Sequence, residues 1–470
     1  MNKTNNLGYV AFLSIVAALG GFLFGYDTAV ISGTISKVAG QFELNTLQSG
    51  WYVGSALVGS IMGVMAAGAM SDKIGRKKTM LISATLFTIS AIGCALSGNW
   101  DQLVIFRIIG GIGIGIVSIV CPIYISEVSV ASHRGRMVSL YQLAITIGFL
   151  GAYLMNYYLL NLSSTFSSSS PLLTQILGTE EWRGMLGAEA FPAIVFFMII
   201  FLIPESPRWL ITKGKEAGAR KTFDLIYRDR AEVNFQINET KQMLQSEEKA
   251  NWKLLFQPGT FRIVLIGAAI AILGQFMGVN AVLYYGPTIF ESSGLSSGDS
   301  LFYQSLIGIV NMGTTILALL IIDKVGRKKL VYFGVSGMIV SLIAIGVYFM
   351  KGEAWGVSNT FLLVFFLLYM FFTAGSISAV IFVFLSEMYP TKIRGLAMSV
   401  AGLSLWVGTY LIGQLTPWML ENLTSAGTFF LFAGMCIPYM LIVWKLMPET
   451  AGKSLEDIER FWLKQKPILK

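Results

Sequence analysis

Two oppositely charged residues, Asp27 and Arg107, stand inside long apolar segments of the chain. Placing a charge at the centre of a membrane helix costs about 3 kcal/mol on insertion scales, so such residues are candidates for function. A rise of about 1.5 Å per residue puts both at a similar depth in the outer half of a bilayer. A carboxylate beside a guanidinium stays ionised, and separation favours its protonation. We predict a proton-coupling pair; the alternative is a static buried ion pair.

A second group of candidates consists of amide and aromatic side chains inside apolar segments. Amides bind the hydroxyl groups of a polar ligand, and an aromatic face can cover its C–H side. The candidates for substrate contact are Gln142, Gln275, Asn280, Asn311 and Trp406, and Tyr284 and Tyr285 suit a gate over the ligand. Only a locally irregular helix would aim both Gln275 and Asn280 inward, and the nearby glycines and Pro287 predict that irregularity. The alternative for each amide is a hydrogen bond between helices.

Three short motifs occur twice, in the same order. The heptapeptide Asp-Lys-x-Gly-Arg-Lys-Lys fills 72–78 and 323–329. Glu127 and Glu387 each precede an arginine by seven residues, and Pro-Glu pairs follow at 204–205 and 448–449. Two copies in one order indicate a parallel repeat of two halves, related by an axis along the membrane normal.

The repeated motifs carry matched charges. Arginine forks onto carboxylates, which suits a network that forms and dissolves between two states. The predicted network, named here the latch, comprises Asp72, Arg76, Glu127, Arg134, Glu205, Arg208, Asp323, Arg327, Glu387, Arg394 and Glu449. The alternative is that the basic residues only orient the chain in the membrane. That alternative explains the lysines and leaves the matched carboxylates unexplained.

The elements that must position these residues are membrane-spanning helices. The 470 residues are 54% hydrophobic and only 13% charged, which is too apolar for a soluble domain. A span takes about 20 apolar residues. We predict an all-α integral membrane protein with twelve spans near 9–33, 48–70, 79–98, 101–124, 137–160, 184–204, 261–286, 302–322, 330–350, 360–385, 396–418 and 427–447.

Charge and composition then limit the function. The net charge is +8, but the basic residues sort into alternate loops, which predicts cytoplasmic termini and no nucleic-acid partner. Three scattered cysteines and one histidine offer no metal site, no disulfide framework and no nucleophile–base pair. We therefore expect no cofactor and no enzymatic activity. The predicted domains are a six-helix half at 1–204, a cytoplasmic linker of short amphipathic helices at 205–257, a second half at 258–447 and a tail at 448–470.

In order along the chain, these motifs resemble those of the sugar porter family of the major facilitator superfamily. The residues that carry the resemblance are Gly-Tyr-Asp-Thr-Ala at 25–29, the two heptapeptides, 122–127, 204–210, 275–285 and 448–453. The pattern is most similar to bacterial proton-coupled monosaccharide symporters of the xylose type. The resemblance implies that the latch holds the inner side closed, and that an aspartate at position 27 goes with proton symport.

The resemblance also assigns site residues. It implies sugar contacts at Gln142, Gln275, Asn280, Tyr285, Asn311 and Trp406, with Phe24 as an aromatic beside the site. Phe382 stands where the family has a tryptophan, and Gly274 and Leu405 stand where relatives have glutamine. Each of these three changes removes a hydrogen-bonding group, so the sequence leaves the identity of the sugar open.

We therefore expect a multi-pass protein of the cell membrane that imports a pentose or hexose with protons by alternating access, as a monomer in the lipid bilayer. A uniporter of the same fold is the nearest alternative. A sugar sensor would need a long cytoplasmic tail, and only about 20 residues follow the last predicted span. An efflux pump for apolar compounds fits less well, because its site would favour bare apolar walls.

Overall fold

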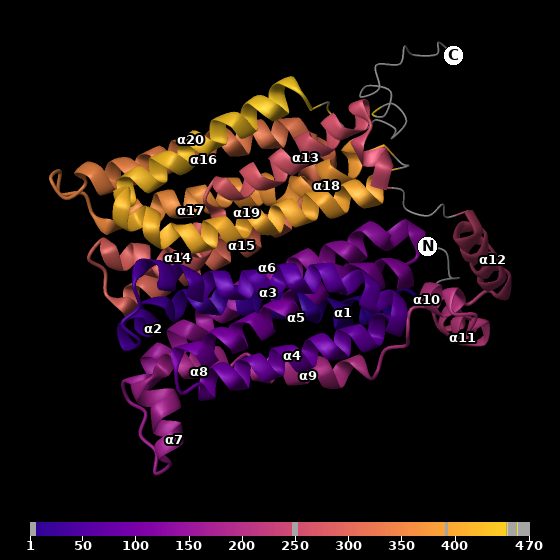
Figure 1. Ribbon diagram of the computed structural model, residues 1–470, viewed down its shortest axis with the longest axis horizontal. Coiled ribbons are helices and arrows are strands. Elements are labelled where there is room, and N and C mark those ends of the chain that lie inside the picture. The colour runs from indigo at the N-terminus through magenta and orange to yellow at the C-terminus, as the bar shows by residue number, and fades with distance from the viewer. Residues whose placement is uncertain (1–5, 247–251, 391–392, 448, 450–457, 459–470) are drawn as a thin grey trace. The chain divides into compact units, whose positions relative to one another are not determined.

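The computed structural model describes residues 6–246, 252–390, 393–447, 449 and 458, except for the side chains of 244–246, 258, 323, 324 and 382. In these residues all regular structure is helical (Figure 1). Twelve helical segments are long and apolar enough to cross a membrane, and they coincide with the twelve predicted spans. The prediction of an all-α membrane protein with twelve spans is confirmed.

The chain divides into two compact units. Unit 1 comprises 1–38 and 55–249, and unit 2 comprises 39–54 and 250–470. This division differs from the predicted domains in that 39–54, which includes the start of the second span, clusters with unit 2. It also assigns most of the predicted linker to unit 1.

The first half of the chain contains six spans and ends with three further helices. Its helices are α1 (Leu7–Val30), α2 (Ile35–Gln41), α3 (Thr46–Ile74), α4 (Arg76–Leu96), α5 (Trp100–Val128), α6 (Arg134–Ser163), α7 (Pro171–Thr174), α8 (Glu181–Gly187), α9 (Ala190–Ile200), α10 (Pro207–Thr212), α11 (Glu216–Ile226) and α12 (Arg230–Ser246). Asn6 and Asn99 cap the starts of α1 and α5, where their side chains accept backbone N–H bonds.

The second half of the chain contains helices of comparable length. Two of its spans, the seventh and the tenth, are each interrupted and consist of two helices. Its helices are α13 (Pro258–Phe276), α14 (Val279–Ser292), α15 (Ser297–Val325), α16 (Arg327–Lys351), α17 (Asn359–Gly375), α18 (Ile377–Met388), α19 (Arg394–Asn422) and α20 (Thr424–Lys445). The seventh span breaks at Gly278, which has a φ of +92°. The tenth breaks at Ser376, between α17 and α18.

The same pairs of spans are in contact within each unit. In unit 1, α1 packs on α6, and α4 packs on α5 and α9. In unit 2, α13 packs on α19, and α16 packs on α17 and α20. The first span therefore packs on the fifth, as the seventh packs on the eleventh. The third span packs on the fourth and the sixth, as the ninth packs on the tenth and the twelfth. The repeat seen in the loop motifs extends to helix packing.

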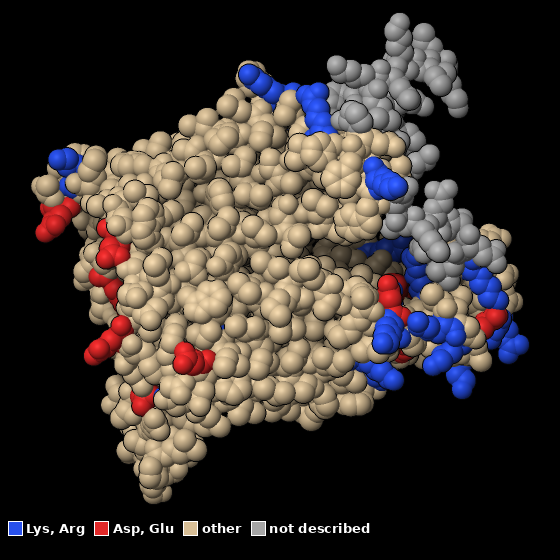
Figure 2. All heavy atoms as spheres, viewed as in Figure 1, with Lys and Arg blue, Asp and Glu red and all other residues tan. Residues whose placement is uncertain are grey.

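The segment between the sixth and seventh spans forms α10, α11 and α12, which pack on one another in unit 1 (Figure 1). Helix α11 has a marked division between an apolar face, with Phe223 and Ile226 buried, and a charged face. Its last turn is joined to the start of α1, because the Asn6 backbone N–H donates to the Ile226 carbonyl at 2.9 Å. Figure 2 shows Lys and Arg side chains gathered over these short helices.

Candidate functional site

The structure brings Asp27 of α1 and Arg107 of α5 together as a buried ion pair. Asp27 Oδ1 accepts a hydrogen bond from Arg107 Nη1. Their side chains are 0% and 3% exposed, so no solvent screens the pair. Contact between α1 and α5 places the two residues 80 positions apart in sequence at one height. The predicted meeting of the two charges is present in unit 1.

A second buried carboxylate, Glu189, lies close enough to this pair for the charges of Asp27 and Arg107 to act on it. Glu189 directly precedes α9 and is 3% exposed. Within the described residues, neither Glu189 Oε1 nor Asp27 Oδ2 has a hydrogen-bond partner. If both carboxyl groups are ionised, they carry one more negative charge than the single guanidinium of Arg107 balances.

Sequence reasoning missed Glu189 although the signal was available. The residue falls inside the predicted sixth span at 184–204, and an ionisable residue inside a span was the criterion that selected Asp27.

The amide candidates of the seventh span meet across its break. Asn280, in the first turn of α14, donates from Nδ2 to Gln275 Oε1 of α13 at 2.6 Å. Thr409 of α19, which the sequence analysis did not select, donates to the same oxygen at 3.2 Å. Gly278 permits this geometry through its positive φ and because a Cβ there would collide with the Phe432 ring. The predicted helix irregularity is present.

The other predicted substrate residues fall into both units. In unit 2, Tyr285 of α14 donates to the Gly413 carbonyl of α19 at 2.6 Å, and Asn311 and Trp406 are buried on α15 and α19. Phe24 and Gln142 are half-buried on α1 and α6 of unit 1. The side chain of Phe382 lies outside the described part of the structure. Each unit thus presents a partial set of candidate contacts.

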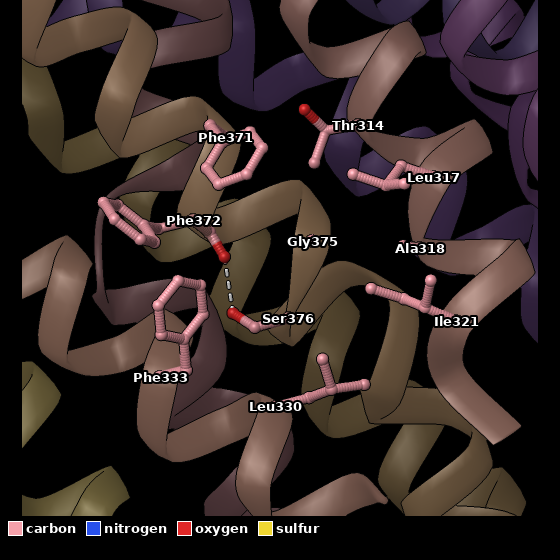
Figure 3. A pocket seen from close by; sticks show the side chains of 10 residues that line it. All are labelled: Thr314, Leu317, Ala318, Ile321, Leu330, Phe333, Phe371, Phe372, Gly375 and Ser376. Atoms are coloured by element: carbon pink, nitrogen blue, oxygen red, sulfur yellow. Dashed lines mark hydrogen bonds between the residues drawn. The ribbon is translucent and has the colours of Figure 1, made fainter. Parts of the chain in front are cut away.

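A small cavity of about 50 Å³ lies in unit 2 at the break of the tenth span (Figure 3). Ser376 Oγ donates to the Phe372 carbonyl at 2.5 Å and so bonds within its own segment. The remaining walls are mostly apolar and include Leu317, Phe333 and Phe371. A sugar needs several hydrogen-bond partners, so this cavity is unsuited to it.

Four of the predicted latch residues of unit 1 form one connected cluster, namely Asp72, Arg76, Glu127 and Glu205. Arg76 donates from Nε and Nη2 to the two oxygens of Glu127, both at 3.0 Å, and from Nη1 to Asp72 Oδ1 at 3.1 Å. Glu205 accepts the backbone N–H of Arg76 at 2.9 Å and that of Lys77 at 3.2 Å, at the start of α4. Burial raises the pKa of Glu205, although these N–H bonds oppose the shift.

Unit 2 repeats this cluster with fewer bonds described. Arg327 Nη2 donates to Glu387 Oε1 at 3.2 Å. Glu449 accepts the backbone N–H of Arg327 and of Lys328, both at 3.1 Å. The side chain of Asp323 lies outside the described residues. Gly75 and Gly326 precede the two arginines with φ of +99° and +93°, which explains the glycine in both heptapeptides.

Arg134 and Arg394 were predicted from their spacing of seven residues after a glutamate. In the structure, Glu127 and Glu387 bond the heptapeptide arginines, and Arg394 donates to the Tyr389 carbonyl at 3.3 and 3.2 Å. The charge of Arg134 acts on Tyr227 of the short-helix segment, where burial raises the phenol pKa and Arg134 opposes the shift. Arg208 lies in the first turn of α10.

A pair of lysine contacts was also missed. Lys77 Nζ donates to the Phe201 carbonyl at 3.0 Å, just after α9. Lys328 Nζ donates to the Met447 carbonyl at 2.9 Å, just after α20. Lys77 and Lys328 thus each donate a hydrogen bond to a carbonyl at the end of the last span of their own unit. Helix termini leave such carbonyl acceptors unpaired.

Comparison with known proteins identifies the family. The sequence model of the sugar (and other) transporter family matches residues 13–462. The chain belongs to this family. An arabinose-proton symporter of Bacillus subtilis is 35% identical, over 99% of this chain and 97% of its own. A D-xylose-proton symporter of Escherichia coli K12 is 34% identical, over 98% of this chain and 97% of its own.

A solved structure of the xylose transporter XylE from E. coli, in a partially occluded inward-open conformation, matches with a TM-score of 0.82. It is 32% identical, and the match covers 95% of this chain and 100% of that one. The family and the twelve spans make this chain a multi-pass membrane protein of the major facilitator fold, in a family of transporters.

Proposed function

We propose that this chain is a monosaccharide:proton symporter of the cell membrane that imports a pentose or hexose by alternating access. The observation that carries the proposal is the buried Asp27–Arg107 ion pair with Glu189 beside it. Burying charged side chains inside membrane helices costs free energy, and such residues are usually retained for a function such as proton binding. The symport named for the arabinose and xylose relatives supports the same assignment.

In the proposed cycle, Asp27 accepts a proton and releases Arg107, which allows α1 and α5 to rearrange. Protonation removes the charge that the guanidinium attracts, so the two forms of the pair stabilise different helix arrangements. Glu189 provides the second carboxylate, so that Arg107 keeps a partner when Asp27 is neutral. The proposed cycle consists of one proton binding to Asp27 and a helix rearrangement, and it leaves the sugar chemically unchanged, so the proposed protein is not an enzyme.

The substrate contacts in this proposal are Phe24, Gln142, Gln275, Asn280, Tyr285, Asn311, Phe382 and Trp406. Thr409 joins them because it shares the acceptor Gln275 Oε1 with Asn280. Amide pairs that bond each other in the absence of sugar can exchange those bonds for sugar hydroxyls, so binding leaves no buried polar group unsatisfied.

The two clusters around Arg76 and Arg327 form the proposed cytoplasmic latch, and both termini are cytoplasmic in this proposal. Each cluster joins the start of one span to the end of another, so bonds across it resist movement of those ends. Two six-helix halves at 1–204 and 258–447, joined by the short-helix linker, form a monomeric transporter.

The test is transport by the purified protein in proteoliposomes. We expect uptake of at least one sugar from a panel of labelled pentoses and hexoses, accumulation driven by an inward proton gradient, and alkalinisation of the medium with sugar entry. Sugar entry that only equilibrates and moves no protons would make the chain a uniporter. Absence of uptake for the whole panel would overturn the assignment to sugars.

A further inference from the structure

Helix α14 contains a proline, Pro287, in its interior. Proline has no N–H, so it cannot donate the bond that a helical residue normally gives to the carbonyl four positions earlier, here that of Leu283. A carbonyl in a membrane helix needs a donor from elsewhere, because lipid supplies none. The question is which group of unit 2 supplies it.

The donor comes from Gln304 of the neighbouring helix α15. Its Nε2 lies 3.3 Å from the Leu283 carbonyl and 3.3 Å from the Val282 carbonyl. The side chain is 0% exposed, which is costly for an amide without partners. A Cβ at Gly286 would collide with the Gln304 amide, so glycine at this position is what lets the amide reach the helix.

On another side, α14 is tied to α19 by the bond from Tyr285 Oη to the Gly413 carbonyl, at 2.6 Å. Gln304 and Tyr285 thus connect one short helix to two neighbours through backbone carbonyls. The same helix carries Asn280, the partner of Gln275. The position of α14 therefore sets where two proposed substrate residues point.

Gln304 Oε1 has no hydrogen-bond partner among the described residues. A residue that served only to fill space would be apolar, because an unsatisfied buried acceptor destabilises the fold. Retaining glutamine at this cost indicates that its N–H donors are needed.

We propose that Gln304 is a positioning residue for substrate binding: by bonding the carbonyls beside Pro287, it holds α14 in the orientation that presents Asn280 and Tyr285. This inference rests on the proposed transport of a sugar. It assigns Gln304 no contact with the sugar.

The test is a double-mutant cycle between Gln304→Leu and Pro287→Ala. Leucine removes the donors at similar volume, and alanine at 287 restores an N–H that can reach the Leu283 carbonyl. We expect Gln304→Leu to raise KM for sugar by roughly five- to tenfold, as lost hydrogen bonds of this kind would, with a smaller change in maximal rate. In the Pro287→Ala background the same change should raise KM by only about twofold.

Hydrogen exchange gives a readout that needs no sugar. We expect faster amide exchange across 279–292 in purified Gln304→Leu, and less acceleration in the double variant. Asn156→Leu is the matched control, because Asn156 is a buried amide of unit 1 that donates to the Val30 carbonyl at 3.0 Å. Its effect should be the same in either Pro287 background.

Equal effects of Gln304→Leu with and without Pro287, or unchanged exchange across 279–292, would overturn the inference. Should Gln304→Leu fail to fold, Gln304→Met carries the same comparison with a more adaptable side chain. If the unmodified protein transports no sugar, the proposed function fails, whereas the exchange measurement still decides whether Gln304 holds α14.

Discussion

The two units of the molecule use the same helix pairing for different polar chemistry. In unit 1, the first span is unbroken from Leu7 to Val30 and carries Asp27 against Arg107. In unit 2, the corresponding seventh span breaks at Gly278 and carries Gln275 and Asn280 on either side of the break. The buried charges of unit 1 thus lie on an unbroken helix, whereas the buried amides of unit 2 lie on either side of a break. The repeat therefore conserves packing and varies the polar groups.

The largest expected effect comes from removing the buried charge of unit 1. Asp27→Asn should reduce proton-driven accumulation to an internal-to-external sugar ratio of about one, while equilibrium exchange changes less than about twofold, because the amide cannot carry a proton. Accumulation and exchange are measured with labelled sugar in proteoliposomes. Asp101→Asn is the control, since Asp101 is an exposed aspartate in the first turn of the helix that carries Arg107. Retained accumulation in Asp27→Asn would refute the proton role.

The next effect compares the two latch clusters. Arg76 bonds Glu127, whose side chain is 8% exposed, and Arg327 bonds Glu387, whose side chain is 23% exposed. We expect Arg76→Gln to lower initial uptake by roughly tenfold and Arg327→Gln by about threefold, because solvent screens the more exposed pair more strongly. Uptake is normalised to the amount of protein in the membrane. The exposed Lys73→Gln serves as the control, and equal losses in both arginine variants would contradict this ranking.

A third change tests how the amide residues of unit 2 set the preference between sugars. A Cβ at Gly274 would meet Ile381, Tyr439 and Ile377 at 3.6 to 3.9 Å, so a Cβ can be added there without a collision. Gly274→Gln should shift the ratio of pentose to hexose affinity by about fivefold, because an amide beside Gln275 adds hydrogen bonds to specific hydroxyls. Competition against a labelled sugar measures the ratio. Gly274→Leu adds similar bulk without an amide, and an equal shift in that variant would show that size alone decides.

The smallest expected effect concerns Glu205 in the unit 1 cluster. Burial raises its pKa in the folded protein above the ordinary value of 4.5 for a glutamate. A carboxyl with a raised folded pKa stabilises the fold below its unfolded pKa, and that contribution is lost as pH rises through the folded pKa. Thermal melting in detergent should therefore shift upward by roughly 2 °C as pH falls from 7 toward 4.5, relative to Glu205→Gln. The same pH slope in both proteins would exclude Glu205 as its source.

Much of the fold could be predicted because membrane-spanning helices are recognisable as long apolar segments of the sequence. Because lipid offers no hydrogen-bond partners, the backbone N–H and C=O groups of a span must bond each other within a helix. The lengths of the apolar segments were therefore enough to locate the twelve spans. The break near Gly278 was also predictable, since glycines and Pro287 cluster there. Asp27 and Arg107 were found by the same rule, because an ionisable residue stands out in an apolar segment.

The rest of the site required contacts between distant segments. Spacing placed Arg134 and Arg394 in the predicted latch, but it did not indicate that Glu127 and Glu387 bond Arg76 and Arg327, which lie 51 and 60 residues away from them. Spacing along a chain cannot rank partners that approach from other helices. Gln304 has no motif at all, and only its approach to the carbonyls beside Pro287 distinguishes it from an ordinary buried amide.

The sequence by itself determined that this protein crosses a membrane twelve times, repeats its charged loops and places an acid and a base inside spans, because these are properties of composition and order. The tertiary structure decided which charges pair, that the buried Glu189 lies within range of the charges of Asp27 and Arg107, and which amide bonds the carbonyls beside Pro287. Those choices depend on distances of a few ångströms between helices, which packing fixes and local sequence does not encode.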